Sequence, residues 1–369
     1  QAYFTRLRET GLYVISAEDE KTSPYYGVPY TSIGKKHANE VGFFIQDEWN
    51  VTPKLTIVPG IRLDSHSSGE EYATSVKVSD SAFPSTKFSK TTINPRIAVK
   101  YEVTPSLILR ANIGTGFRAP YGFSEDLHLC SGSPRVWKSS NLKGERAISY
   151  NLSADYYSKQ YQFSINLFRT NLKDKIQFSP ADDEVKKFGY SYQWENVDDA
   201  YVQGVELGAK ASIARNLTAG VNWTFNQGKF KHERAEWSDP NDESVKEFPQ
   251  RLKYAKESRY ISRFPGMTGD FDIDYTPGTW TFSLTGSLQG SMYIDYNSED
   301  AGQNSKIKKT STFMLFNCRA SKRLGMCTIY AGAKNIFSYI QDEKHTDDAA
   351  FMYAPVYGAT WYVGLSVKL

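Results

Sequence analysis

The chain has 369 residues, with 44 basic and 41 acidic side chains and a formal net charge of +3 at pH 7. That balance is too even to indicate a nucleic-acid partner, and an aromatic content of 14% argues against disorder. No apolar run approaches the roughly 20 residues of a membrane-spanning helix. Three cysteines allow at most one disulfide bond, which excludes a disulfide scaffold.

The predicted elements are strands with one apolar and one polar face. After a weaker segment near 3–14, the segment 55–63 places Leu55, Ile57 and Ile61 on one face. The same period of two residues recurs in segments that include 94–101, 107–113, 161–167, 217–225 and 361–369. Thirteen clear segments and the weaker first one give about 14 strands, and no stretch has a sustained helical period. The sequence therefore predicts an all-β fold.

The connections between these strands alternate strictly between short and long. Short turns lie at 51–54, 103–106, 158–160, 214–216, 276–279 and 323–325, and long polar loops lie near 65–92, 117–146, 175–198, 229–263, 295–311 and 338–357. Short turns on one side and long loops on the other are typical of an antiparallel transmembrane β-barrel, whose apolar face meets lipid. Such a barrel must close, because an open edge in hydrocarbon leaves backbone groups unpaired.

Two soluble all-β folds are the alternatives. A β-sandwich would also alternate apolar and polar residues, but its connections need not alternate in length. A propeller would show a repeat of roughly 40 residues, which the sequence lacks. Aromatic residues such as Trp49, Tyr101 and Trp280 lie at strand ends, where the interfacial girdle of a membrane barrel would place them. The membrane barrel is therefore preferred.

Seven short motifs support a more specific assignment. They are Phe44-Ile-Gln-Asp-Glu-Trp49, Gly60-Ile-Arg-Leu-Asp64, Asn94-Pro-Arg96, Gly116-Phe-Arg-Ala-Pro120, Asn141-Leu-Lys-Gly-Glu145, Val202-Gln-Gly-Val-Glu-Leu207 and Ala333-Lys-Asn-Ile-Phe337. In this order, across residues 40–369, the chain resembles the TonB-dependent outer-membrane receptors. Gly144 stands where that family usually has proline, and we expect no functional effect from this difference.

The resemblance implies a barrel of 22 strands with an N-terminal plug. About 14 of these strands are visible here and the plug is absent, so residues 1–369 are expected to be the C-terminal portion of one receptor barrel, without its first strands and plug. The implied location is the outer membrane. The implied partners are outer-membrane lipid and the TonB–ExbB–ExbD energy-transducing complex, which would act through the plug. A surface lipoprotein is a candidate lid.

The resemblance also implies a function. The expected protein is an active-transport receptor that imports a scarce iron complex, either a ferric siderophore or haem, with energy from TonB. A cobalamin receptor of the same family is the alternative. A passive porin is a weaker one, because it would lack the motif series. No intrinsic cofactor is expected.

Enzymatic constellations are absent from the sequence. It contains no Gly-x-Ser-x-Gly, no phosphate-binding glycine loop and no His-Glu-x-x-His motif, so we predict that the chain is not an enzyme. Cys318 and Cys327 flank the turn at 323–325 on the apolar face. A disulfide bond between them and two free thiols are both open interpretations.

Candidate ligand-binding residues lie in two of the long loops. They are Arg118, Tyr121, Phe123, His128, Cys130 and Trp137 in the first, and His345, Met352 and Tyr353 in the last. Haem receptors that resemble this family carry an iron-ligating histidine in the interval where His128 lies, and imidazole suits haem iron. The competing interpretation, a loop histidine in a siderophore or cobalamin receptor, is the favoured one. Arg118 also reads as a structural residue of the rim.

Overall fold

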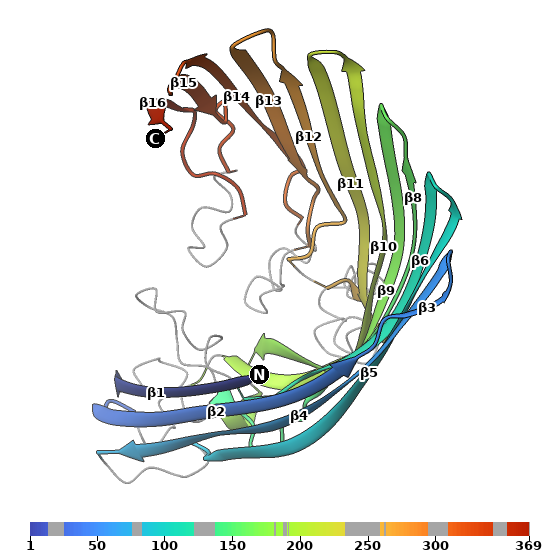
Figure 1. Cartoon of the computed structure of the whole chain (residues 1–369). Helices are drawn as coiled ribbons and strands as arrows, with labels where there is room; N and C mark the ends of the chain where they lie inside the picture. Colours follow the sequence, from blue (N-terminus) through green and yellow to red (C-terminus); the bar gives the residue numbers. More distant parts are fainter. Residues whose placement is uncertain are drawn as a thin grey trace, which may run out of the picture.

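The computed structural model describes residues 1–13, 26–75, 83–121, 137–180, 182–186, 190, 192–232, 259–261, 263–293, 309–341 and 353–368. These residues form one strongly curved sheet (Figure 1). Its strands are β1 (Ala2–Tyr13), β2 (Tyr30–Gln46), β3 (Trp49–Thr52), β4 (Leu55–Thr74), β5 (Thr86–Thr104), β6 (Leu107–Arg118), β7 (Trp137–Lys138), β8 (Glu145–Tyr157), β9 (Tyr161–Pro180), β10 (Tyr192–Ala214), β11 (Leu217–Phe230), β12 (Met267–Tyr275), β13 (Trp280–Gln289), β14 (Phe313–Leu324), β15 (Cys327–Lys334) and β16 (Thr360–Val367).

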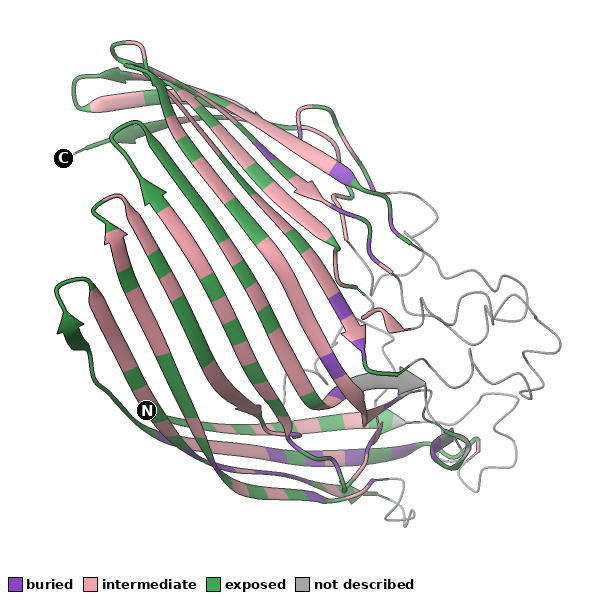
Figure 2. Ribbon diagram, turned by 90° about the vertical axis from the view of Figure 1, so that its right-hand side faces the viewer, coloured by how far each residue is buried: buried purple, intermediate pink, exposed green. Residues whose placement is uncertain are grey.

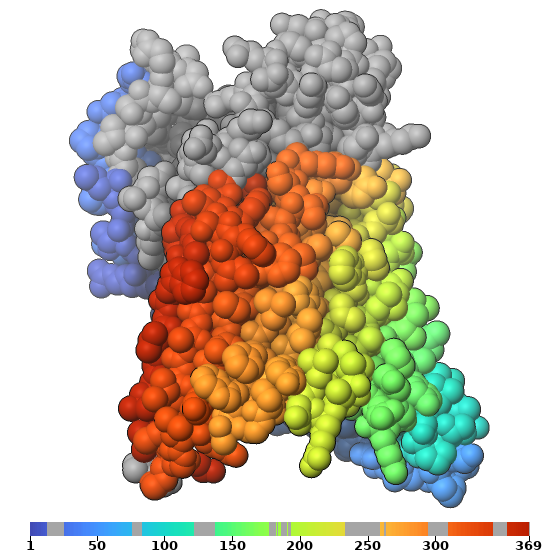
Figure 3. All heavy atoms as spheres, turned by 90° about the horizontal axis from the view of Figure 1, so that it is seen from above, coloured from blue at the N-terminus to red at the C-terminus, as the bar shows by residue number. Residues whose placement is uncertain are grey.

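Neighbouring strands in the sheet are also neighbours in the sequence. The hydrogen-bonded order is β1-β2-β4-β5-β6-β8-β9-β10-β11-β12-β13-β14-β15-β16, while β3 pairs with β4 and β7 pairs with β10 beside this path. Every pair on the path is antiparallel. The predicted all-β antiparallel fold is confirmed, and the weak first segment is strand β1. The space-filling view shows the later strands as one continuous surface, from yellow β11 to red β16 (Figure 3).

The helical content of the described residues is small. Helix α1 (Asp183–Lys186) has four residues. Among the described residues, no helix combines the length and the apolarity needed to cross a membrane.

The two faces of the sheet differ as the period of two predicted. In β4, Leu63 is 44% exposed and its neighbour Asp64 is 3% exposed. Exposed apolar side chains continue on the same face in β5 and β6, at Ile97 and Leu109. We call this the outer face and the face of Asp64 the inner face. Exposed and less exposed residues alternate along the strands in Figure 2.

Three short turns share one local device. Thr52 Oγ1 accepts hydrogen bonds from the backbone N–H groups of Lys54 and Leu55 at 3.2 and 3.0 Å. Thr104 Oγ1 accepts hydrogen bonds from the backbone N–H groups of Ser106 and Leu107. Ser158 Oγ accepts them from the backbone N–H groups of Gln160 and Tyr161. Side-chain hydroxyls that bond their own backbone in this way favour tight turns. Two other turns need a left-handed residue, which Gly278 and Gly325 provide at φ of 63° and 61°.

The strands differ in length, which determines how far the wall extends. A transmembrane strand needs about 9–11 residues, and β12 and β13 have 9 and 10. By contrast β4, β5, β9 and β10 have 20, 19, 20 and 23 residues. The short turns fix one end of the strands, so the extra residues extend the wall at the end that carries the long connections. We call this the long-loop end.

Strand register excludes the disulfide interpretation for the pair at the β14–β15 turn. Cys327 lies opposite Leu324, whereas Cys318 lies opposite Ala333, six residues farther along the hairpin. Six residues of strand span about 20 Å, much more than the roughly 7 Å limit between the Cα atoms of a disulfide. Cys318 and Cys327 are free cysteines.

Candidate ligand site at the long-loop end

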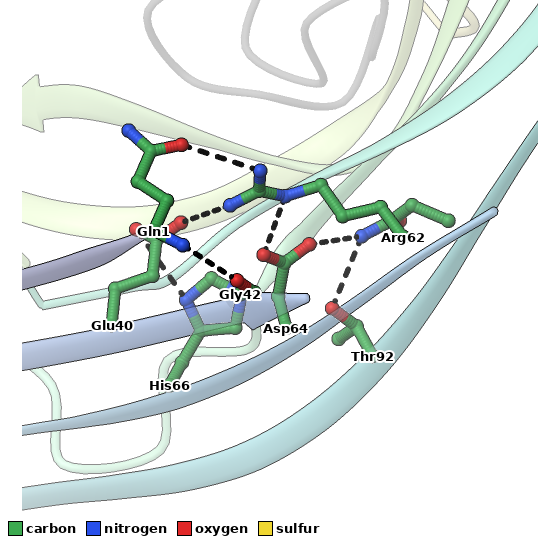
Figure 4. A network of polar contacts seen from close by, with 8 residues as sticks. Gln1, Glu40, Gly42, Arg62, Asp64, His66 and Thr92 are labelled. Carbon is green, nitrogen blue, oxygen red and sulfur yellow. Dashed lines mark hydrogen bonds and ion pairs between the residues drawn. The ribbon is translucent and has the colours of Figure 1, made fainter. Parts of the chain in front are cut away.

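Polar side chains on the inner face of β4 and β5 hold one another in place (Figure 4). Arg62 Nε lies 2.6 Å from Asp64 Oδ1. Asn94 Nδ2 donates to Asp64 Oδ2 at 3.0 Å and contacts Thr92 Oγ1 at 3.3 Å. Asp64, although ionisable, is buried because its oxygens have these donors.

The same network reaches Glu40 of β2 and His66, the next inner-face residue of β4 after Asp64. Glu40 lies 3.6 Å from Arg62 Nη2 and 3.9 Å from His66 Nδ1 (Figure 4). The His66 ring packs against Phe117 of β6 at a centroid distance of 5.0 Å. Its Nε2 atom is buried without a hydrogen-bond partner among the described residues. The inner wall therefore offers charged and aromatic groups in fixed positions.

A buried ion pair joins β4 to the segment that follows residues 122–136. Lys138 Nζ lies 2.8 Å from Glu70 Oε1, and their side chains are 7% and 2% exposed. Tyr72 donates its hydroxyl to Glu70 Oε2 at 2.7 Å. Lys138 comes from β7, which pairs in parallel with Gln193 and Trp194 of β10. The segment that follows the loop is thus bound to two strands of the wall.

Tyr121 anchors the near side of the same loop. It is buried, and its hydroxyl donates to the carbonyl oxygen of Ser139 at 2.8 Å. Burial, opposed by a backbone hydrogen bond from Leu142 and reinforced by the charge of Glu70, raises the pKa of Tyr121 to about 12. The hydroxyl therefore stays protonated and keeps its role as a donor across the physiological range.

Arg118 and Trp137 are placed near these anchors with structural contacts of their own. Arg118 ends β6, is opposite Glu145 in register, and has its Nη1 atom 4.0 Å from Glu145 Oε2. The structural interpretation of Arg118 as a rim residue agrees with this position. Trp137 packs against Val185 and Tyr190. Arg118, Tyr121 and Trp137 are thus held by contacts with the wall, and their roles in ligand binding stay predictions.

Tyr353 belongs to a second group, at the ends of β13 to β15. Its backbone N–H donates to Gln341 Oε1 at 2.8 Å, and its ring lies 6.1 Å from Phe313. Its carbonyl oxygen accepts a hydrogen bond from Gln289 at 3.4 Å. These contacts anchor the return of the last long loop to the wall.

Five predicted ligand residues lie outside the described residues: Phe123, His128, Cys130, His345 and Met352. Their roles, including the ligation of haem iron by His128, stay predictions. Among the described residues, no group of three or more histidine, cysteine, aspartate or glutamate side chains could hold a metal ion.

Sequence reasoning missed the pair of Glu70 and Lys138. The period of two does place Glu70 on the inner face with Asp64 and His66. A partner 68 residues away in the sequence leaves no periodic signal. The alternation of inner and outer residues was the one signal for Glu70. It marks an inward carboxylate in the part of β4 that is longer than a membrane crossing requires.

Comparison with known proteins identifies the architecture. The family model described as "TonB dependent receptor-like, beta-barrel" matches residues 5–336. The vitamin B12 transporter BtuB of Photobacterium profundum is 26% identical over 203 residues, covering 54% of this chain and 27% of the transporter. The ferric enterobactin receptor of Pseudomonas aeruginosa is 26% identical over 201 residues, covering 50% of this chain and 24% of the receptor.

Solved structures show the same fold. The ferric yersiniabactin uptake receptor FyuA from Yersinia pestis has a TM-score of 0.62 at 15% identity, covering 99% of this chain and 49% of that chain. The copper transporter OprC has a TM-score of 0.61 at 17% identity, covering 91% of this chain and 48% of that chain. The matched region is thus about half of these structures and about a quarter of the curated relatives.

Proposed function

Because the chain belongs to the TonB-dependent receptor-like β-barrel family of the outer membrane, we propose that it forms the wall of a receptor that imports an iron complex. The proposal depends mainly on the family match across residues 5–336. Membership of a family of transporters agrees with the prediction that the chain is not an enzyme, and it disfavours a passive porin.

The open edges of the sheet support the proposal that further strands close the barrel. Among the described residues, β1 pairs only with β2 and β16 only with β15. Unpaired edges are costly in hydrocarbon. We therefore propose that the chain is the C-terminal portion of one barrel, and that the remaining strands and a plug belong to the same receptor. Energy would reach this receptor from the TonB–ExbB–ExbD complex through the plug.

The anchored loop supports the binding of a ligand at the long-loop end. Tyr121 and Lys138 hold the two sides of residues 122–136 to the inner wall. A loop fixed at its base loses less conformational entropy when it orders around a ligand. The predicted ligand residues Phe123, His128 and Cys130 lie between these anchors in the sequence.

The cargo is tested first by growth. The gene of the intact receptor is deleted, and separate cultures of this strain each receive one compound. A ferric siderophore or haem is the only iron source, or cobalamin is the only source of the vitamin. We expect growth to fail on an iron complex and to return when the gene is restored. Failure on cobalamin alone would replace the iron proposal with the cobalamin receptor, whose support is the similarity to a vitamin B12 transporter.

A second experiment tests the haem alternative. Purified intact receptor is mixed with haem, and the Soret band is compared in the wild type, His128→Ala and His128→Ala/His345→Ala. If haem is the cargo, the band shifts in the single variant and weakens further in the double variant. His232→Ala is the control, because His232 is an exposed histidine at the long-loop end that contacts Asp198. Absence of a Soret band in the wild type, or no change in the double variant, would exclude haem.

A further inference from the structure

Pairing between β5 and β6 stops before the two strands end. The last paired residues are Arg96 and Gly114, although β5 begins at Thr86 and β6 continues to Arg118. Beyond this point β5 stays paired with β4, and β6 stays paired with β8. The wall therefore has a split between β5 and β6 at the long-loop end, with one strand edge on each side.

Pro95 occupies the first position of β5 beyond the last pair. It has no N–H group that could donate a hydrogen bond to β6. Its carbonyl oxygen accepts a hydrogen bond from the Thr115 hydroxyl of β6 at 3.2 Å. The backbone ladder thus loses a donor at the point where the two strands separate.

Two contacts show which backbone groups of β5 point into the split. The Glu102 N–H group donates to the Lys54 carbonyl oxygen beside β4 at 2.8 Å, so even-numbered residues bond toward β4. The Pro95 carbonyl oxygen faces β6, so odd-numbered residues bond toward β6. This direction alternates along a strand, and the register of β4 with β5 is unbroken. The backbone groups of the odd-numbered residues between 87 and 93 therefore point into the split.

These groups form a free strand edge. Among the described residues, no strand pairs with this edge and no other backbone group forms a hydrogen bond with it. The four residues of the edge are Lys87, Ser89, Thr91 and Ile93. Their side chains are exposed, and Ile93 is 63% exposed. An unpaired edge of this kind is a template for another extended chain.

A crevice of about 850 Å³ lies at the split. Residues 91–94 of β5 line it with side chains of both faces, and Phe117 lines it from β6. The Phe117 ring also packs against His66 of the inner-face network. The crevice is thus continuous with the inner face, and it gives the free edge of β5 space beside it.

Positive charge dominates the crevice. The basic lining residues are Arg146, Arg169, Lys173, Lys231 and Arg259. Asp199 is the one carboxylate among the described lining residues, and it already accepts a hydrogen bond from the Asp174 backbone at 3.2 Å. Arg146 lies directly opposite Lys173, and like charges in this arrangement are destabilising. A bound chain that carries carboxylates would relieve this repulsion and form charge-assisted hydrogen bonds.

We propose that the split binds an extended acidic peptide segment of another protein outside the cell, by strand addition to the free edge of β5. The edge supplies the main-chain hydrogen bonds, and the basic side chains select carboxylates. A lipid fits less well, because it has no row of alternating donors and acceptors to match the edge. This binding does not depend on which cargo the receptor imports.

The test measures the binding of short fluorescent peptides to the intact receptor in detergent by fluorescence anisotropy. In the acidic probe, glutamate alternates with valine. One control peptide has lysine in place of glutamate. The other carries a methyl group on every backbone nitrogen and cannot donate main-chain hydrogen bonds. We expect the acidic probe to bind about tenfold more tightly than either control, and salt to weaken it.

Hydrogen–deuterium exchange gives the location of the bound probe. Saturation with the acidic peptide should slow exchange in residues 87–93 and leave β12 unchanged, because new hydrogen bonds form only at the free edge of β5. Absence of protection in residues 87–93 at saturation would overturn the proposal.

Matched variants separate the two contributions. Thr91→Pro removes one N–H group from the free edge and should weaken binding of the acidic probe about tenfold, whereas Thr91→Val keeps that group and should bind as the wild type does. Arg146→Gln/Lys173→Gln should also weaken binding about tenfold. Lys54→Gln/Arg215→Gln, which changes two exposed residues in the short turns, should have no effect.

The peptide arm decides the proposal even if Thr91→Pro fails to fold. Equal binding of the acidic and the methylated peptides would show electrostatic contact without strand addition, and would overturn the proposal. Equal binding of the acidic and the lysine peptides would overturn the choice of an acidic partner. Protection of residues 87–93 without any peptide, in a receptor that elutes as a dimer, would show a second copy as the occupant instead.

Discussion

The long strands β2, β4, β5, β9 and β10 and the shorter strands β12 to β16 cross the same membrane but end differently. β2, β4, β5, β9 and β10 have 17 to 23 residues, whereas β12 to β16 have 8 to 12. We call them the long-strand part and the short-strand part. The long-strand part uses its extra residues for polar contacts, such as the buried pair of Glu70 and Lys138 and the contact of the buried Lys36 with the half-exposed Glu9.

The short-strand part ends in packed rings and side-chain amides instead. Phe313 stacks on Tyr339 at 4.9 Å, and the buried Gln341 holds the backbone of Tyr353. Buried charges require their partners, whereas a stacked aromatic pair contributes only about 0.5–1.5 kcal/mol beyond the area that it buries. The comparison teaches that the two parts should respond differently at their ends and alike in the membrane.

The largest expected effect is the loss of one member of the buried pair in the long-strand part. Lys138→Ala leaves Glu70 buried without its cation, which should destabilise the receptor by about 3–5 kcal/mol. Urea-induced unfolding of the intact receptor in lipid vesicles measures it. Glu70→Met/Lys138→Met should recover most of the loss, because no unpaired charge remains.

The matched change in the short-strand part should be mild. Lys322→Ala removes an amine that lies over Trp280 at 4.9 Å near the turns, a contact that contributes about 0.5–1 kcal/mol at exposed sites. Equal losses for Lys138→Ala and Lys322→Ala would break the comparison between the two parts.

In the membrane band the two parts should behave alike. Ile97 and Ile273 are exposed on the outer face, one in each part. An arginine at either position should destabilise the receptor by roughly 2–4 kcal/mol near the midplane. Asn222→Arg, on the inner face of β11, is the mild control. The same unfolding assay applies, and tolerance of arginine on both faces would contradict the membrane orientation.

The last prediction is a pH dependence at Tyr121, which has no effect on stability at neutral pH. Tyr121 has a pKa of about 12 in the folded state, against about 10 for an unperturbed tyrosine. The folded protein therefore holds a proton that the unfolded chain loses, and stability falls as pH rises from about 10 to about 12.

This dependence has a direct spectroscopic measurement. The ring carbon next to the hydroxyl is labelled with ¹³C in all tyrosines, and the Tyr121 signal is identified by its absence in Tyr121→Phe. The signal should titrate near pH 12. Titration near 10 would show that the Tyr121 hydroxyl is not buried.

The sequence predicted those features that repeat at short range. The alternation in Gly60-Ile-Arg-Leu-Asp64 is enough to identify a strand and to assign its faces, because side chains alternate in every strand. Register is also local here, since a short turn fixes which residues of a hairpin face each other. For this reason the strand order and the two faces were predictable.

The site depended on contacts that the sequence does not encode locally. Glu70 meets Lys138 only because β4 and β5 extend beyond the membrane and β7 returns to pair with β10. The end of β5–β6 pairing at Gly114 likewise follows from the paths of three strands. Such features depend on how the wall curves, which no period in the sequence reports.

The shared turn device has a kinetic consequence. Thr52, Thr104 and Ser158 each close a connection of only a few residues with their own hydroxyl groups, and a short hairpin forms in about 1–10 μs. The connections at the other end span many more residues, so their closure entropy is larger. Hairpins should therefore zip from the turns outward, and each completed hairpin presents one free edge to the next. The extended ends of β4, β5, β9 and β10 would thus form last.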